Sequence, residues 1–346
     1  MINYRLPAEW EPHEATWIGW PHNRDDWPGK FSPIPWVYAE IVRYLSRGEK
    51  VRIIVEDKVH QNKAERVLRS VDTNSENIEF FKLRTNRGWT RDSGPVFVKN
   101  TVSNDTLLVG FRFNAWAKYD NFKKDEKLPS YISKKFNLKK TVPVLRGRHV
   151  VLEGGSIDTN GRGTLITTEE CLMDGKIQVR NPGFSKKDYE KIFADYLGIS
   201  NTIWLKKGIA GDDTHGHIDD LCRFVNNNTV VVVGEKNKSD KNYYNLKENK
   251  EILENSRLED GSSLNVIGLP MPSALVFRGE RLPASYANFY ISNYAVLVPT
   301  FNDPEDKNAL GIISEIITDR PVIGIHAVDL VWGLGTLHCL THEHPL

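Results

Sequence analysis

Residues 223–235 read "RFVNNNTVVVVGE", two runs of strand-forming residues around an Asn-rich turn. Asn tolerates the positive φ angles of a tight turn, so this stretch predicts a β-hairpin. The same pattern recurs in "VFVKNTVSNDTLLVGF" (96–111), "SIDTNGRGTLITTEE" (156–170) and "FYISNYAVLVPTF" (289–301). The hairpin is therefore a repeated element of the chain.

The residues after each hairpin also follow a common pattern. A helical stretch comes next, and then a short run rich in β-forming residues. The predicted helices cover 127–137, 185–198 with Ser185 as N-cap, 245–256 and 308–319, and the predicted strands cover 141–145, 202–205, 264–269 and 321–327. The N-terminal part continues the pattern with predicted helices at 36–47 and 58–70 and predicted strands at 51–56 and 78–83.

This arrangement predicts the fold class. The hairpin–helix–strand unit recurs about five times, at roughly 60-residue spacing. No low-complexity linker separates the units, and each is too small to bury its own faces, so we expect them to pack on one another. We therefore predict an α/β fold in which residues 1–346 form a single domain, a ring of ββαβ modules. An ordinary mixed α/β domain with coincidental hairpins is the alternative.

The composition narrows the class of function. The 46 Lys and Arg residues balance 45 Asp and Glu residues, which does not favour a nucleic-acid partner. The lysines between residues 122 and 140 predict a solvated helix face rather than a binding surface. The three cysteines form no CxxC motif and indicate a reducing compartment. The first residues lack the apolar region of a signal peptide, and no apolar run approaches the roughly 20 residues of a membrane helix, so we expect a cytoplasmic protein.

Chemically capable side chains follow the predicted single strands. Each has an ordinary structural explanation when it is taken alone: a turn or cap carboxylate, a strand end, a buried histidine or a small buried thiol. Cys171 and Cys222 keep that explanation. A functional role is favoured for the remaining residues because they fall at equivalent places in the repeated units, beside glycines or abrupt turns. In a ring of such units these places would converge. They are Asp92, Glu153, His217, Asp219 and Cys339.

This set of residues favours one kind of chemistry. Buried carboxylates repel one another and need a cation, and a planar, forked guanidinium suits them. A cysteine with a histidine suggests a thiolate nucleophile with a proton shuttle. Together they favour deimination, in which a guanidine and water give a ureido group and ammonia. The C-terminal "HCLTHEH" (338–344) raises a metal site as the alternative, but its histidines could lie exposed, and an extended strand would turn His338 away from Cys339.

Several stretches resemble the agmatine deiminase family, which is grouped with bacterial peptidylarginine deiminase-like proteins in the guanidino-group-modifying superfamily. They span nearly the whole chain and are specific as a set: "LPAEWEPHEATWIGWPHN" (6–23), "WTRDSGP" (89–95), "LEGGSI" (152–157), "TTEECL" (167–172), "DDTHGHIDD" (212–220), "ASYANFYISN" (284–293) and "LHCLT" (337–341). The resemblance implies a five-bladed ββαβ pseudo-symmetric α/β propeller, the pentein fold. It also implies that agmatine and water give N-carbamoylputrescine and ammonia, a step of polyamine and putrescine biosynthesis.

The resemblance also implies the roles of individual residues. Cys339 would be the nucleophile and His217 the general acid and base. Asp92 and Asp219 would grip the guanidinium, Glu153 would support the site, and Trp89 would pack on the substrate. No metal and no organic cofactor would be needed.

The sequence departs from the family at three places that could affect the far end of the substrate. They are "GLGTLHC" (333–339), where a glycine run is usual, "FNAWAKYDNFKKDEKLP" (113–129), and the tail "THEHP" (341–345). Free arginine or a peptidyl C-terminal arginine therefore remain alternative substrates, with Arg87, Arg91, Arg146 and Arg148 as candidates for the carboxylate of free arginine. Amidino transfer and a non-catalytic binding module are the further alternatives. The oligomeric state stays open, with a homo-oligomer among the options.

Overall fold

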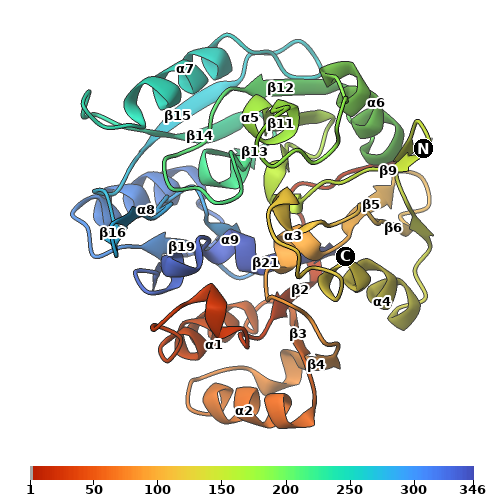
Figure 1. The fold of residues 1–346 in the computed structure, drawn as a ribbon, viewed down its shortest axis with the longest axis vertical. Coiled ribbons are helices and arrows are strands. Elements are labelled where there is room, and N and C mark those ends of the chain that lie inside the picture. The colour runs from red at the N-terminus through yellow and green to blue at the C-terminus, as the bar shows by residue number, and fades with distance from the viewer. Residues whose placement is uncertain (1–2) are drawn as a thin grey trace. The chain divides into compact units, whose positions relative to one another are not determined.

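All four hairpins that the sequence predicts are present in the structure, a computed structural model that describes residues 3–346 (Figure 1). The opening stretch, 223–235, forms β13 (Cys222–Asn226) and β14 (Thr229–Gly234), which pair antiparallel around Asn227 and Asn228. The other three hairpins are β5 (Val96–Asn100) with β6 (Thr106–Val109), β10 (Asp158–Thr159) with β11 (Thr164–Thr168), and β18 (Tyr290–Ile291) with β19 (Val296–Thr300). The Asn-rich turns therefore identified the hairpins correctly.

The chain divides into two compact units. Unit 1 contains the described residues up to Ala8 together with Asp92–Leu269, and unit 2 contains Glu9–Arg91 and Pro270–Leu346. Both combine antiparallel hairpins with parallel strands and helices. The chain therefore has a mixed α/β fold.

In unit 1, a strand joins three of the hairpins on the side of their second strand. β7 (Lys140–Thr141) pairs parallel with β6, β12 (Asn201–Leu205) pairs parallel with β11, and β15 (Asn265–Pro270) lies next to β14. The connecting helices are α4 (Leu128–Lys135), α6 (Lys186–Leu197) and α7 (Tyr243–Glu254). The remaining elements include β1 (Tyr4–Arg5), which pairs with β5, the hairpin β8 (Val144–Leu145)–β9 (Arg148–His149), and α5 (Glu169–Met173).

Unit 2 contains two sheets with the same alternation. β20 (Val322–His326) pairs parallel with β19 after α8 (Glu305–Ile316). In the other sheet β2 (His13–Gly19) pairs antiparallel with β21 (Thr341–Pro345) and parallel with β3 (Lys50–Val55), which in turn pairs parallel with β4 (Ile78–Lys82). Its helices are α1 (Ile34–Leu45) and α2 (Lys58–Leu68), and the hairpin β16 (Val276–Phe277)–β17 (Glu280–Arg281) lies outside both sheets.

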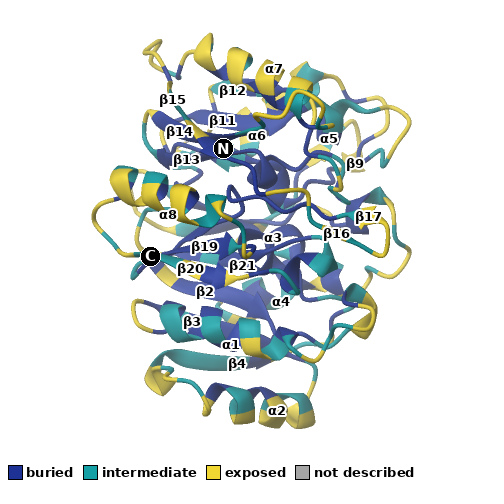
Figure 2. Ribbon diagram, turned by 90° about the vertical axis from the view of Figure 1, so that its left-hand side faces the viewer, coloured by how far each residue is buried: buried dark blue, intermediate teal, exposed yellow. Residues whose placement is uncertain are grey.

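The middle strands β11 and β14 of two three-stranded sheets in unit 1 are deeply buried. All residues of β11 are buried, as are five of the six residues of β14. Figure 2 shows these strands in dark blue, while α2, α7 and α8 have exposed faces. Strands covered on both faces read as continuous β-branched runs, which explains "TVVVVG" (229–234). These buried strands therefore fix the start of the polar segments that follow them in the chain.

One predicted strand is wrong in detail. The stretch 141–145 was expected to form one strand, but Lys140–Thr141 ends in β7 and Val144–Leu145 belongs to the separate β8–β9 hairpin. Pro143 lies between them, and a proline has no N–H with which to continue a sheet ladder. The sequence pattern of β-branched residues did not show this interruption.

The lysine-rich segment 122–140 agrees with the expected solvated face. Its lysines at 123, 124, 127, 134, 135, 139 and 140 are all exposed, while Leu128 and Ile132 of α4 are buried. In residues 3–346 no helix is long and apolar enough to cross a membrane.

Helix α6 provides a test of the predicted capping. The side chain of Ser185 accepts a hydrogen bond from the backbone N–H of Asp188, and the Asp188 side chain bonds back to the Ser185 backbone. We expect Ser185→Ala to lower the free energy of unfolding by about 1 kcal/mol, because one orphan N–H loses its partner. Urea unfolding followed by circular dichroism measures the change. The exposed Ser239→Ala is the control, and an equal loss in both variants would contradict the cap's role.

Candidate active site

The predicted site residues lie on short helical turns that follow strands. Asp92 is in α3 (Thr90–Ser93), and Cys339 is in α9 (Leu337–Leu340). Glu153 immediately precedes the 3₁₀ turn Gly154–Ser156, while His217 precedes, and Asp219 lies within, the turn Ile218–Asp220. Each of these side chains therefore lies within, or one residue before, a short helical turn.

Unit 1 brings four of these residues together around one imidazole ring. His217 Nδ1 lies 3.8 Å from Asp92 Oδ1 and 3.9 Å from Asp219 Oδ1. On the other side of the ring, His217 Nε2 lies 3.7 Å from Glu153 Oε2. All four residues are at most 3% exposed. The imidazole therefore faces carboxylates on both sides, at distances longer than a hydrogen bond.

Gly155 makes this approach feasible. A Cβ on residue 155 would lie 2.6 Å from His217 Nδ1, 2.9 Å from Asp92 Oδ1 and 3.0 Å from Asp219 Oδ2. The Gly155 N–H also donates to Asp92 Oδ1 at 3.0 Å. A side chain at this position would push the two aspartates and the histidine apart, which explains the second glycine of "LEGGSI" (152–157).

Two further side chains fix the carboxylates, and the sequence analysis missed both. Trp116 Nε1 donates to Asp92 Oδ2 at 2.8 Å. Arg180 Nε donates to Glu153 Oε1 at 3.2 Å, and the side chains of this ion pair are fully buried. The Arg180 guanidinium also donates to the backbone oxygens of Gln178 and Thr214, at 3.0 and 2.5 Å. No motif around Arg180 distinguishes it from other arginines in the sequence.

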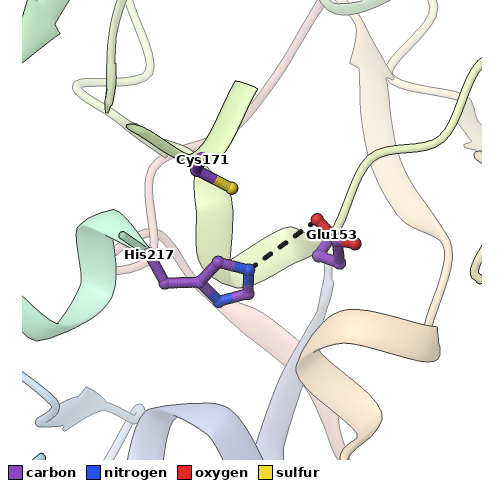
Figure 3. A group of neighbouring side chains, drawn as sticks. All are labelled: Glu153, Cys171 and His217. Carbon is purple, nitrogen blue, oxygen red and sulfur yellow. Dashed lines mark ion pairs between the residues drawn. The ribbon is translucent and has the colours of Figure 1, made fainter. Parts of the chain in front are cut away.

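Cys171 also lies at this site, although the sequence assigned it only to the core. It is 2% exposed and belongs to the hydrophobic cluster of unit 1, as expected. However, ligand atoms of Cys171, His217 and Glu153 all lie within 4.8 Å of one another (Figure 3). The Thr168 hydroxyl accepts from the Cys171 N–H at 3.1 Å and caps α5. The core assignment was therefore incomplete.

The buried charges shift one another's pKa values. Burial lowers the pKa of His217, but the Asp92 and Glu153 carboxylates and the Cys171 sulfur outweigh burial and raise it well above its usual value. Burial disfavours the Glu153 carboxylate, yet Arg180 and His217 lower its pKa to about 2. Burial raises the pKa of Asp92, and the neighbouring carboxylates of Asp219 and Glu153 add to that increase, against the effect of His217. The cluster therefore holds a protonated imidazole near neutral pH and favours cations.

Cys339 and Trp89 belong to unit 2. The Asn288 side chain donates to Cys339 Sγ at 3.2 Å and accepts from the Thr336 hydroxyl at 2.7 Å. A Cβ on Gly335 would lie 2.9 Å from Trp89 Cζ3 and 3.2 Å from Cys339 Sγ, so this glycine lets the indole and the thiol approach. Cys339 is 6% exposed, and the Trp89 ring packs on Trp27 at 5.5 Å between centroids. Asn288 lies within the quoted stretch "ASYANFYISN" (284–293), although the sequence analysis did not single it out.

The C-terminal histidines are not exposed, which corrects the expectation from sequence. His338, His342 and His344 are 2–3% exposed. His338 is also helical rather than extended, and its Nε2 lies 2.8 Å from Glu9 Oε2. In residues 3–346 the grouped metal-capable ligands are those of Glu153, Cys171 and His217, so the tail forms no such group.

Three of the four arginines proposed for a substrate carboxylate already have carboxylate partners. Arg91 and its neighbour Asp92 are both helical rather than extended. The Arg91 side chain pairs with Glu9 at 3.1 Å and with Glu343 at 2.6 Å. Arg87 pairs with Asp26 at 3.3 Å, and Arg146 pairs with Asp188 at 2.7 Å. Arg148 instead stacks over Phe184. These pairings do not favour recognition of free arginine.

Known proteins resemble the chain over nearly its whole length. The model of the Porphyromonas-type peptidyl-arginine deiminase family matches residues 5–345. An agmatine deiminase of Pseudomonas aeruginosa is 31% identical over 365 residues, which cover 99% of this chain and 95% of that protein. The solved structure of an Enterococcus faecalis agmatine deiminase is 28% identical, with a TM-score of 0.89 over 99% of this chain and 96% of the other. A substrate-bound agmatine deiminase variant of C. jejuni is 30% identical, with a TM-score of 0.86 over 98% and 96% of the two chains.

The electrostatic arrangement around His217 can be tested directly. We expect Asp92→Asn to lower the pKa of His217, because the largest contribution that favours the imidazolium is removed. The ring signals of His217, followed by NMR during a pH titration, measure the change. Asp174→Asn is the matched control, since Asp174 pairs with His215 at 2.8 Å instead. A His217 pKa that stays the same in Asp92→Asn, or that falls equally in Asp174→Asn, would exclude this arrangement.

Proposed function

The chain belongs to the Porphyromonas-type peptidyl-arginine deiminase family, and we propose that it is a hydrolase that acts on the C–N bond of a linear amidine. Its proposed substrate is agmatine, which reacts with water to give N-carbamoylputrescine and ammonia. The reaction would pass through a covalent thiouronium on Cys339 and would use no metal and no organic cofactor. The agmatine deiminases described above support this assignment.

The buried carboxylates around His217 are the observation that carries the proposal. Asp92, Glu153 and Asp219 face two cations, Arg180 and a protonated His217. One more cation would balance the charge, and a guanidinium also offers the forked N–H groups that pair with carboxylates. A bound cation would favour the ionised form of Asp92, whose pKa is raised in the structure by burial and its acidic neighbours.

In the proposed mechanism the aspartates hold the substrate and the thiolate attacks it. Asp92 and Asp219 bind guanidinium nitrogens, and Cys339 Sγ forms a bond to the guanidinium carbon. Fixing the reacting groups in this orientation can supply roughly 7–11 kcal/mol of the barrier reduction. Trp89 would pack on the substrate beside these groups.

His217 would then transfer the protons. Its raised pKa provides a protonated imidazole that can donate to the departing nitrogen, so that the C–N bond breaks and ammonia leaves. The neutral imidazole next removes a proton from water, which attacks the thiouronium carbon. The bond between this carbon and Cys339 Sγ breaks, and the ureido product leaves. Glu153, held by Arg180, would keep the imidazole in place.

Two alternative reactions also act on a guanidino group but differ in the substrate or in the acceptor. A deiminase of free or peptidyl C-terminal arginine would give citrulline, and an amidinotransferase would pass the group to an amine. The carboxylate pairings of Arg87, Arg91 and Arg146 favour a substrate without a carboxylate. A non-catalytic binding module would not need the combination of nucleophile, histidine and three carboxylates.

The proposal extends to the architecture and the setting of the enzyme. We propose that residues 1–346 form one catalytic domain, a five-bladed ββαβ propeller, because the alternation of antiparallel and parallel pairing recurs in the sheets of both units. A cytoplasmic location is consistent with the free thiols of Cys171 and Cys222. The binding partner of the enzyme would be the small guanidino substrate. The proposed function is also compatible with a homo-oligomer.

A colorimetric assay for ureido product tests the reaction and the substrate together. We expect ureido product from agmatine, with a lower kcat/KM for arginine and arginyl peptides. Product formation should not depend on an added amine acceptor. Cys339→Ser should lower kcat by at least about a thousandfold, because the covalent step is lost. Mass spectrometry should detect the thiouronium adduct on the wild-type chain alone.

Cys222→Ser is the matched control, since Cys222 is a buried thiol of β13 with no proposed role in catalysis. It should keep the activity of the wild-type chain. Failure to form product from any guanidine would refute the enzyme assignment, whereas product from arginine but not agmatine would refute the substrate.

A further inference from the structure

Two of the proposed catalytic groups form a cluster of possible metal ligands together with a third residue. Cys171, His217 and Glu153 bring a sulfur, an imidazole nitrogen and a carboxylate oxygen within 4.8 Å of one another (Figure 3). The proposed reaction uses the histidine and the glutamate, but it gives the Cys171 sulfur no role. A thiol at this position therefore needs an explanation of its own.

We propose that Cys171, His217 and Glu153 form a binding site for a borderline-soft divalent cation such as Zn²⁺, and that occupation of this site inhibits the enzyme. The inhibitory part rests on the proposed function, whereas the metal site does not. The chain would thus carry an inhibitory metal site rather than a metal cofactor.

The distances fit a tetrahedral ion after small side-chain movements. Zn–N and Zn–O bonds of about 2.0–2.2 Å and a Zn–S bond of about 2.3 Å place tetrahedral ligand atoms roughly 3.3–3.7 Å apart. His217 Nε2 and Glu153 Oε2 already lie 3.7 Å apart. The ligand atoms of the cluster lie at most 4.8 Å apart, so a closing movement of about 1 Å brings all of them into this range.

Buried polar atoms of the cluster are directed at one another without making hydrogen bonds. Within residues 3–346, Glu153 Oε2 and both ring nitrogens of His217 are buried and have no hydrogen-bond partner. Arg180 occupies the other oxygen of Glu153, so Oε2 stays directed at the histidine. Buried polar atoms without partners are costly, and a coordinated cation would satisfy two of them at once.

The ligand types and the local charge indicate which ion fits. A thiolate with an imidazole and one carboxylate suits Zn²⁺, Co²⁺ or Cd²⁺, while Mg²⁺ and Ca²⁺ prefer all-oxygen sites. Asp92 and Asp219 face the same imidazole and add negative charge, against the single positive charge of Arg180. The opening that admits a guanidinium to His217 in the proposed reaction would also admit a metal ion.

Occupation of the site would stop the proposed reaction at its proton-transfer steps. A metal ion on His217 Nε2 removes that lone pair from acid and base chemistry, and it withdraws Glu153 from its supporting role. The expected inhibition therefore depends on Cys171, a residue outside the proposed reaction.

Direct binding is tested with Co²⁺ on the full chain carrying Cys339→Ser, which removes the proposed nucleophile as a competing thiol. We expect a thiolate-to-cobalt charge-transfer band at one ion per chain. Adding Cys171→Ala should abolish the band, and adding Cys222→Ala should retain it. Cys171→Ser, which nearly keeps the side-chain volume, is the second variant, and near-UV circular dichroism verifies the fold. The site is overturned if the band is absent in Cys339→Ser or persists in the Cys171 variants.

Inhibition is tested with Zn²⁺ in the agmatine assay. The concentration for half inhibition should rise at least tenfold in Cys171→Ala relative to the wild-type chain, and Cys222→Ala should show no change. A chelator should restore activity, and Mg²⁺ should have no effect. Equal inhibition of the wild-type and Cys171→Ala chains would overturn the inhibitory role. A cobalt band without activity on any guanidine would leave the metal site established and refute the proposed function instead.

Discussion

The buried ion pair between Arg180 and Glu153 is the interaction on which the rest of the site depends. Removing an ion from water costs several kcal/mol, and breaking a buried pair by losing one partner costs about 3–5 kcal/mol. Arg180 keeps Glu153 ionised inside the protein, and the ionised Glu153 helps to keep His217 protonated. The imidazolium in turn allows Asp92 and Asp219 to be buried beside it. The carboxylates thus depend on a guanidinium belonging to the protein before any substrate arrives.

Much of the fold could be predicted from sequence, because its signals are local. The Asn-rich turns identified the hairpins, and Ser185 identified the start of α6. Asp92, Glu153, His217 and Asp219 were found because they follow strands beside glycines or turns. Arg180 and Cys171 were missed as site residues because their importance comes from tertiary contacts, across 27 residues for Arg180 and Glu153. A lone arginine and a core cysteine give no local sign of such contacts.

The C-terminal tail shows how a sequence motif can be misinterpreted. The His-Glu-His ending resembled either a metal cluster or an incidental feature, yet these side chains belong to the buried network of unit 2. Glu343 pairs with the buried Arg91, and His344 lies 2.8 Å from the Arg52 guanidinium. Leu334, just before this tail, has a φ of 66°, a conformation that costs a residue with a side chain about 1–2 kcal/mol.

The pairing of β21 with β2 joins residues near opposite ends of the chain, for example Trp17 with His342. Closing so long a loop carries a large entropic cost and is a slow, non-local step in folding. Cys339 lies in the short helix directly before β21, so its position depends on this pairing. Partly folded chains would therefore contain the thiol without its native surroundings. Catalytic competence would develop only as the whole chain folds, which makes activity during refolding a sensitive report on complete folding.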